Sequence, residues 1–155
     1  MAEKLNMPVS EFLRRRVAAL QDIPKIAAAH ALIFTERVKE HFTLESSAPK
    51  GEDWEELSES YAKRKKGPSI LVETGALRSS IGSRVTSGDG SVTIHTGSNE
   101  TKGVNVEGGV AAVHQYGTRD GRIPARPFLA HQDADIEALQ DDLGRALAGH
   151  GEINA

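Results

Sequence analysis

Apolar side chains recur every three or four residues near both ends of the chain, a spacing typical of amphipathic helices. The first such stretch predicts a helix over residues 10–21, with Ser10 as its cap and apolar residues at a spacing of three or four (Phe12, Leu13, Val17 and Leu20). Asp22-Ile23-Pro24 then predicts a break, because proline suits the first turn of a new helix. That second helix is expected from Pro24 to Phe42, and a final helix is expected from His131 to Ala148.

The middle of the chain has shorter periodic segments separated by glycine and polar residues. Short helices are predicted over 54–62 and 74–81, the second with Thr74 as its cap. Two strands, 82–86 and 91–96, flank the glycine-rich turn at 87–90, with Val85, Val92 and Ile94 on their apolar side. Loops are expected at 43–53 and at 97–109.

These elements predict an α+β fold with long N-terminal helices, a small antiparallel β-sheet and a C-terminal helix. We divide the chain into an N-terminal helical arm (1–22), a single α+β domain (23–148) and a flexible tail (149–155). Whether 1–22 and 97–109 become ordered only in an assembly is left open by the sequence.

Composition and charge narrow the function classes. Of the 155 residues, 38% are hydrophobic and only 5% aromatic, so the core is lean and neighbouring subunits could contribute to order. The net charge of -3 is unfavourable for a free-standing nucleic-acid binder, and the absence of cysteine excludes disulfides and thiol chemistry. We see no signal peptide and no apolar run near the roughly 20 residues that span a bilayer, so we expect a soluble protein with no membrane contact.

Residues 123–129, Ile-Pro-Ala-Arg-Pro-Phe-Leu, are the most distinctive segment, and we call them the strap. Two prolines fix φ, remove two backbone donors and favour extended backbone before each of them. A stiff segment of this kind can present side chains to other molecules but holds no nucleophile or metal cluster. We therefore predict subunit or partner contacts by the strap and by the end of the apolar segment before it (His114, Gln115, Tyr116, Arg126, Pro127 and Phe128).

Individual roles are also expected within and around the strap. Arg126 is expected either to form a forked ion pair with a carboxylate, within or between subunits, or to be an exposed arginine of little consequence. His114 is expected to be buried and hydrogen-bonded, and Trp54 and Phe128 to be core residues.

Templates for catalysis and metal binding do not fit the chain. The six histidines lack the spacing of metal ligands on one helix. The sequence around Ser79 and Ser80 lacks the Gly-x-Ser-x-Gly pattern of a nucleophile elbow, and no phosphate-binding loop is present. We therefore expect no enzyme activity, no metal and no cofactor.

Four consecutive cations, Lys63, Arg64, Lys65 and Lys66, form the best candidate for nucleic-acid contact. They could face passing DNA as a positive rim. They could equally be a solvated helix end that offsets the helix dipole, or could pair with acidic residues of an adjacent subunit.

Several segments, in order, resemble the phage virion morphogenesis family, the tail-completion proteins of Mu-like and related tailed phages. They are Trp54–Ser58 with Tyr61–Lys65, then Ile70–Ile81, Ala111–Gly117 and Ile123–Leu129. The resemblance implies a small antiparallel sheet packed on a long helix and a structural role at the neck, where a DNA-filled head meets the tail. The sequence departs from the usual family pattern at Leu129-Ala130-His131.

On this basis we expect a non-enzymatic virion protein at the head–tail junction, assembled in the host cytoplasm, that completes the tail and joins it to the head. A homo-oligomeric ring, six- or twelve-fold, would contact other neck, tail or connector proteins and transiently the packaged DNA. The alternatives are a small DNA-binding accessory protein that uses Lys63–Lys66 and an assembly factor absent from the finished particle.

Overall fold

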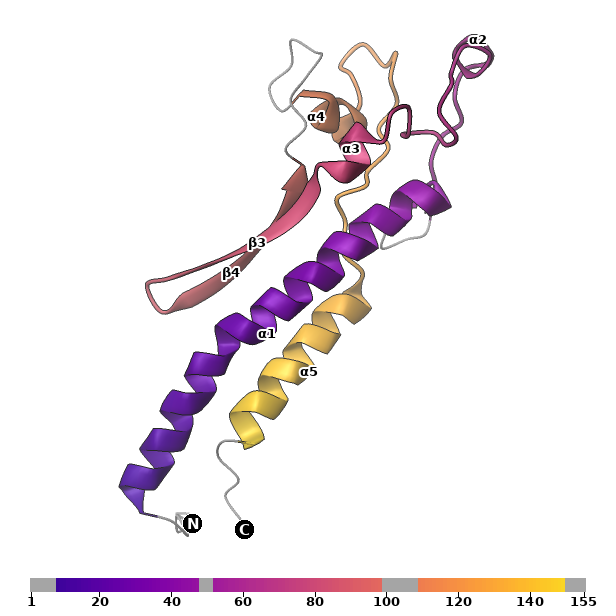
Figure 1. The fold of residues 1–155 in the computed structure, drawn as a ribbon. Helices are drawn as coiled ribbons and strands as arrows, with labels where there is room; N and C mark the ends of the chain where they lie inside the picture. Colours follow the sequence, from indigo (N-terminus) through magenta and orange to yellow (C-terminus); the bar gives the residue numbers. More distant parts are fainter. Residues whose placement is uncertain (1–7, 48–51, 99–108, 150–155) are drawn as a thin grey trace.

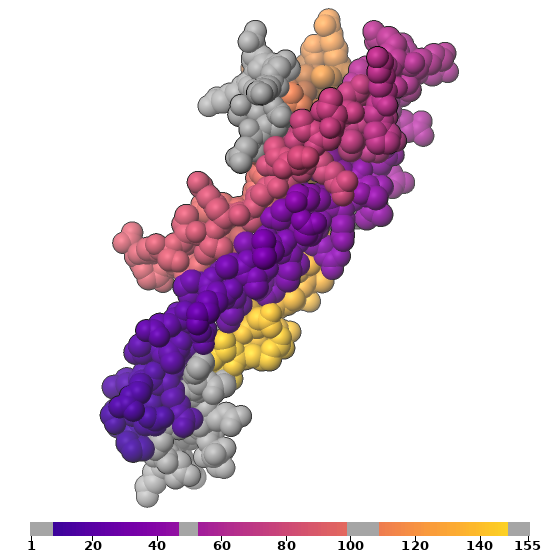
Figure 2. Space-filling view, in the orientation of Figure 1, coloured from indigo at the N-terminus to yellow at the C-terminus, as the bar shows by residue number. Residues whose placement is uncertain are grey.

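One long helix organises the whole molecule. The computed structural model describes residues 8–47, 52–98 and 109–149. Helix α1 (Val9–Leu44) has a hairpin of strands β3 (Ile81–Gly88) and β4 (Ser91–Ser98) along one side and helix α5 (Asp133–Gly149) along another (Figure 1). The space-filling view shows an elongated body, and among the described residues the first turns of α1 lie at its lower end (Figure 2). The predicted α+β fold is confirmed.

The predicted break at Pro24 is wrong, because α1 runs through it without interruption. Proline removes one amide from the helical ladder and ordinarily kinks or ends a helix. Here tertiary packing holds both halves in line: Ala19 and Ala27, on either side of Pro24, are both buried. Packing of an amphipathic face contributes more to helix stability than local propensity does, and it overrides the proline. The division into 1–22, 23–148 and 149–155 stays a prediction.

Both ends of α1 differ from the sequence expectation. Pro8 is the N-cap and Ser10 lies inside the helix, so Ser10 does not cap it. The helix continues two residues past Phe42 to Leu44, and its C-cap is Glu45, whose φ of 53° places it in the left-handed region. Two short strands follow, β1 (Ser46–Ser47) and β2 (Glu52–Asp53), within the predicted loop 43–53.

By length and composition alone, α1 could span a membrane, with an 18-residue window of mean hydropathy 1.3. This differs from the expectation that no apolar run approaches the length of a membrane span. The helix packs its buried residues against the rest of the chain, among them Phe34, Val38 and Phe42. The apolar residues in this second half of the helix are therefore explained by their burial in the protein core.

The hairpin confirms both predicted strands and extends them. Its antiparallel register pairs Ile81 with Ser98 and Val85 with Ile94. Asp89 and Gly90 form a two-residue turn with φ of 51° and 73°, the positive values that a tight type I′ hairpin requires. Val85, Val92 and Ile94 are half-buried on the same face, as predicted, and that face packs on α1.

The described helices in the middle of the chain are short, and a longer one closes the fold. The structure has α2 at Glu59–Ala62 and α3 at Ala76–Ser79, each a single turn and shorter than predicted. Thr74 precedes the N-cap, Gly75, but its hydroxyl still accepts a hydrogen bond from the Ala76 amide at 3.3 Å. Helix α4 (Gly109–Tyr116) was predicted only as an apolar segment. Most of the predicted loop 97–109 lies outside the described residues. The C-terminal helix prediction is confirmed by α5, which begins two residues later than expected.

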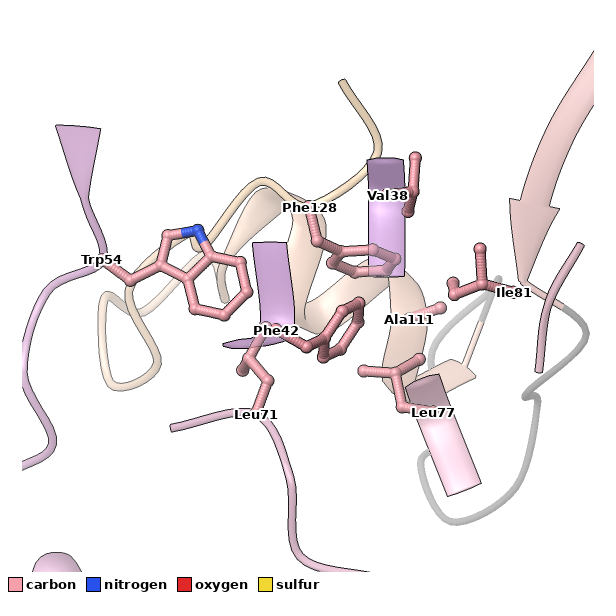
Figure 3. Close-up of a cluster of buried hydrophobic side chains, with 8 residues drawn as sticks. All are labelled: Val38, Phe42, Trp54, Leu71, Leu77, Ile81, Ala111 and Phe128. Atoms are coloured by element: carbon pink, nitrogen blue, oxygen red, sulfur yellow. The ribbon is translucent and has the colours of Figure 1, made fainter. Parts of the chain in front are cut away.

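The hydrophobic core lies at one end of the molecule, around the last turns of α1. Figure 3 shows eight buried side chains that come from α1, α3, α4, β3, the strap and the segments near Trp54 and Leu71. Phe42 lies at their centre, with ring centroids 5.2 Å from Phe128 and 5.8 Å from Trp54. The core therefore holds the strap against the last turns of α1.

Candidate protein-interaction site

The strap is held against α4 by main-chain and amide hydrogen bonds. The Arg126 amide donates to the His114 carbonyl at 2.7 Å. The Gln115 side-chain oxygen accepts from the amides of Phe128 and Leu129, at 3.0 and 2.9 Å. Gln115 therefore satisfies two donors of its own chain, and its contact with other subunits stays a prediction.

Gly117 allows this close approach between the end of α4 and the strap. Its φ is 73°, and an added Cβ would lie 2.9 Å from both the Ala125 nitrogen and the Ile123 oxygen. Such a distance is shorter than any ordinary contact, so only glycine fits without movement of the strap.

Arg126 binds main-chain oxygens of its own chain, and among the described residues it has no carboxylate partner. It is 3% exposed, and its Nε and Nη2 donate to the carbonyls of Glu55 and Glu56 at 2.8 and 3.1 Å. Burial lowers the pKa of Arg126, an effect opposed by the nearby charge of Glu55. The prediction of a forked ion pair is thus wrong, as is that of an exposed arginine. The fork instead ties the strap to the segment before α2.

The last residues of the strap also face inward. The Pro127 carbonyl accepts a hydrogen bond from Trp54 Nε1 at 3.2 Å, and His41 Nδ1 lies 2.8 Å from the Phe128 oxygen. Phe128 is completely buried. Its predicted core role and that of Trp54 are confirmed, whereas a direct contact of the Phe128 side chain with another subunit is excluded in this fold.

Beside the strap lies a hollow of about 630 Å³. Its wall includes Tyr61 and Arg64 from the α2 region, His114 from α4, and Arg122 and Pro124 around the strap. His114 is half-buried, and its Nδ1 is buried with no hydrogen-bond partner among the described residues, contrary to the expected hydrogen bond. Burial, and secondarily the charge of Arg126, lowers the pKa of His114.

Tyr116 is the predicted contact residue that the fold leaves on the surface. It is 80% exposed at the end of α4, next to the left-handed Gly117. An exposed tyrosine offers a large amphipathic contact area at low entropic cost. Among the strap-region predictions, Tyr116 therefore retains the strongest case for contact with another protein.

The four-cation run is divided by the structure. Lys65 is buried at its side chain and donates to the Val72 carbonyl at 2.6 Å and to the Glu73 carboxylate at 3.1 Å. The Lys65 hydrogen bond lowers the pKa of Glu73. Lys65 therefore closes a turn of its own chain and is not available to DNA, which corrects that part of the prediction. DNA contact by Lys63, Arg64 and Lys66 stays a prediction.

An exposed apolar surface lies on the first turns of α1 and includes Leu13, Val17 and Leu20 of the predicted apolar face. Four large side chains there are between 54% and 62% exposed (Val9, Leu13, Val17 and Leu20), and we call them the seam. Their regular spacing was visible in the sequence. What could not be seen there is that no other described element covers them.

Among the described residues, no group of three or more His, Asp or Glu side chains comes together as metal ligands would. The described structure presents two features: an exposed apolar surface on the long helix α1, and a strap that hydrogen bonds hold in place. These features define the class of a small α+β structural protein with surfaces suited to contacting other proteins.

The chain belongs to the phage virion morphogenesis family, whose sequence model matches residues 6–148, nearly the whole chain. It is thus a structural protein of bacteriophage virion assembly, associated with the virion and with other virion proteins. No curated protein and no solved structure matches the chain.

Proposed function

We propose that this protein forms a homo-oligomeric ring at the head–tail junction, where it completes the tail and joins it to the head without enzymatic activity. The seam carries the proposal. Leaving four large apolar side chains in water on one helix face is unfavourable, and association with another protein removes that cost. The family supplies the setting, because an assembling virion provides neighbouring subunits.

The strap region supports the same proposal from the opposite end of the molecule. Hydrogen bonds from Gln115 and Arg126 brace it, so Tyr116 is presented by a rigid backbone. Rigid aromatic anchors lose little conformational entropy on binding. We assign Tyr116 and the hollow beside the strap to contacts with a head, tail or connector protein.

Deletion of the gene, followed by electron microscopy of the resulting particles, tests the proposal. We expect unjoined heads and tails, or tails whose ends are abnormal, and we expect the particles to lose infectivity. Complementation with the wild-type gene is the control. Complete and infectious virions in the absence of the protein would contradict the proposal.

Mass spectrometry of purified virions then separates a component from an assembly factor. A resident ring requires the protein in finished particles at a constant copy number. Normal tail completion with no copies in the virion would instead identify an assembly factor.

A further inference from the structure

The hairpin of β3 and β4 is a sheet of two strands, so each strand has one edge that its partner does not occupy. Facing residues of an antiparallel ladder alternate between hydrogen-bonded and non-hydrogen-bonded pairs. In a hairpin with a two-residue turn, the pair beside the turn is hydrogen-bonded, and here that pair is Gly88 with Ser91. Every second residue from there directs its N–H and C=O away from the partner strand. These edge-facing residues include Ser83, Val85 and Ser87 on β3 and Val92, Ile94 and Thr96 on β4.

The main-chain groups of these edge-facing residues have no hydrogen-bond partner among the described residues. Helix α1 is the only described element with more than marginal contact to the hairpin. It covers one face of the sheet, where Thr35 Oγ1 donates to Ser83 Oγ at 2.8 Å (Figure 1). A row of unpaired N–H and C=O groups along a strand is a template for pairing with another strand.

Neither strand has the features that usually protect an edge from such pairing. Protected edges are short, bulged, or occupied by lysine or proline. Strands β3 and β4 are eight residues each, their register is uninterrupted, and they contain no lysine or proline. Val85, Val92 and Ile94 face α1 but are only half-buried in this two-stranded sheet. A further strand at each edge would satisfy the main chain and cover more of these side chains.

We propose that the hairpins of neighbouring copies join edge to edge, with β4 of one copy paired to β3 of the next in one continuous antiparallel sheet. The inference rests on the proposed ring and names the contact that closes it. A strand from a different protein would fill one edge and bring a new unpaired edge of its own. Repetition of the same hairpin around a closed ring leaves every edge paired, as closure does in a β-barrel. A second copy of this chain is therefore the occupant that satisfies both edges.

The order of the strands makes this contact head-to-tail. Because β3 and β4 run in opposite directions, hairpins that point the same way around a ring place β4 beside the neighbour's β3 in antiparallel orientation. Pairing of β3 with β3 would instead give a two-fold dimer and leave both β4 edges free. The register between copies can shift only in steps of two residues, because a shift of one residue would turn the half-buried face away from α1.

Disulfide cross-linking tests the pairing directly, because the chain contains no cysteine of its own. Thr93→Cys on β4 is mixed with a tagged chain that carries Arg84→Cys, Thr86→Cys or Gly88→Cys on β3. All four positions are exposed on the face away from α1. A disulfide requires Cβ atoms about 3.5–4.5 Å apart, which opposed residues on adjacent strands reach and strands separated by another strand do not.

We expect a mixed disulfide-linked dimer in one of the three combinations, identified by its mass on a non-reducing gel. The three β3 positions are two residues apart and so sample the registers that keep the same face toward α1. Each variant oxidised alone should give no dimer above the background of random collisions. Lys63→Cys, whose native side chain is 76% exposed in the α2 region, measures that background when it is mixed with Thr93→Cys.

A substitution of one edge-facing amide provides an independent measurement. Ser87→Pro removes an N–H that points away from β4, and it leaves the ladder inside the hairpin intact. Ser87→Ala keeps that N–H and is the matched control. In sedimentation velocity, association of Ser87→Pro should be at least about tenfold weaker than that of wild type and Ser87→Ala. Circular dichroism checks the folding of both variants, and the cross-linking result does not depend on the proline being tolerated.

Two results would overturn the inference. Disulfide dimers of Thr86→Cys alone would mean that β3 pairs with β3 in a two-fold dimer. The absence of a mixed dimer in all three combinations would exclude edge pairing, provided that oxidised lysates of the deletion strain complemented with both variants also lack it. Either result leaves the location at the head–tail junction to be decided by the deletion strain, so the two proposals fail separately.

Discussion

The two halves of α1 carry the same apolar stripe but differ in what covers it. Val38, in the second half, is completely buried under the hairpin and the strap. Val17, in the first half, is 54% exposed on the same stripe. The difference shows that the apolar pattern is buried in the core in one half of the helix and stays largely in water in the other.

Substitutions of Phe128 and Tyr116 give the largest expected contrast. Phe128→Ala should lower the free energy of unfolding by about 3–5 kcal/mol, because it removes a fully buried ring from the core. Tyr116→Ala, at an 80% exposed position, should change it by less than about 0.5 kcal/mol. Urea unfolding followed by tryptophan fluorescence measures both. Equal losses would show that Tyr116 belongs to the core rather than to an interaction surface.

Two glycines near the strap form the second test. Gly117→Ala should lower the free energy of unfolding by about 2–4 kcal/mol, through left-handed backbone strain and the clash with Ala125. Gly121→Ala shares the positive φ but meets nothing within 4 Å, so it should cost only about 1–2 kcal/mol. The difference in urea midpoints isolates the close contact. Identical values for the two variants would mean that the strap can move away from α4.

The two valines of α1 test the comparison directly. Val38→Ala should lower the free energy of unfolding by about 2 kcal/mol, from lost burial and the cavity left behind. Val17→Ala should lie within about 0.5 kcal/mol of wild type, since that side chain is half in water and alanine favours helix. The measurement requires protein dilute enough to be monomeric. A large cost at Val17 under those conditions would show that the monomer itself covers the seam.

The cation run gives the smallest effect. Lys65→Met removes the hydrogen bond to the Val72 carbonyl and should lower the free energy of unfolding by about 1 kcal/mol. It should also raise the pKa of Glu73 toward its ordinary value of 4.5, because the Lys65 hydrogen bond is the largest cause of its lowering. NMR titration of the Glu73 carboxyl measures this shift.

The sign of the pH dependence follows from the same pair. A carboxyl whose pKa is lower in the folded state stabilises the protein above its unfolded pKa. That contribution is lost as the pH falls through the lower, folded value, and Lys65→Met should weaken this acid sensitivity. Lys63→Met is the matched control, because Lys63 is exposed and should leave Glu73 unchanged. An unaltered Glu73 titration in Lys65→Met would contradict the internal role of Lys65.

Much of the fold could be predicted from local patterns. Helical spacing predicted the helices at both ends, and alternating valine and isoleucine with Asp89-Gly90 predicted the hairpin. The prediction at Pro24 failed because local propensity was weighed without the packing around Ala19 and Ala27. The site was predicted less well. Arg126, Gln115 and Lys65 form hydrogen bonds with groups of their own chain that only the folded structure identifies.

What the sequence by itself determined is the α+β class, the stiffness of the strap and membership of a phage assembly family through motifs in order. Each of these depends on short-range chemistry: periodicity, fixed φ at proline and characteristic spacing. Only the tertiary structure decided which side chains are used internally and which half of the α1 stripe stays in water. Burial depends on where segments that are distant in sequence meet. Because the hairpin tip diverges from α1, the hairpin does not reach the first turns of that helix.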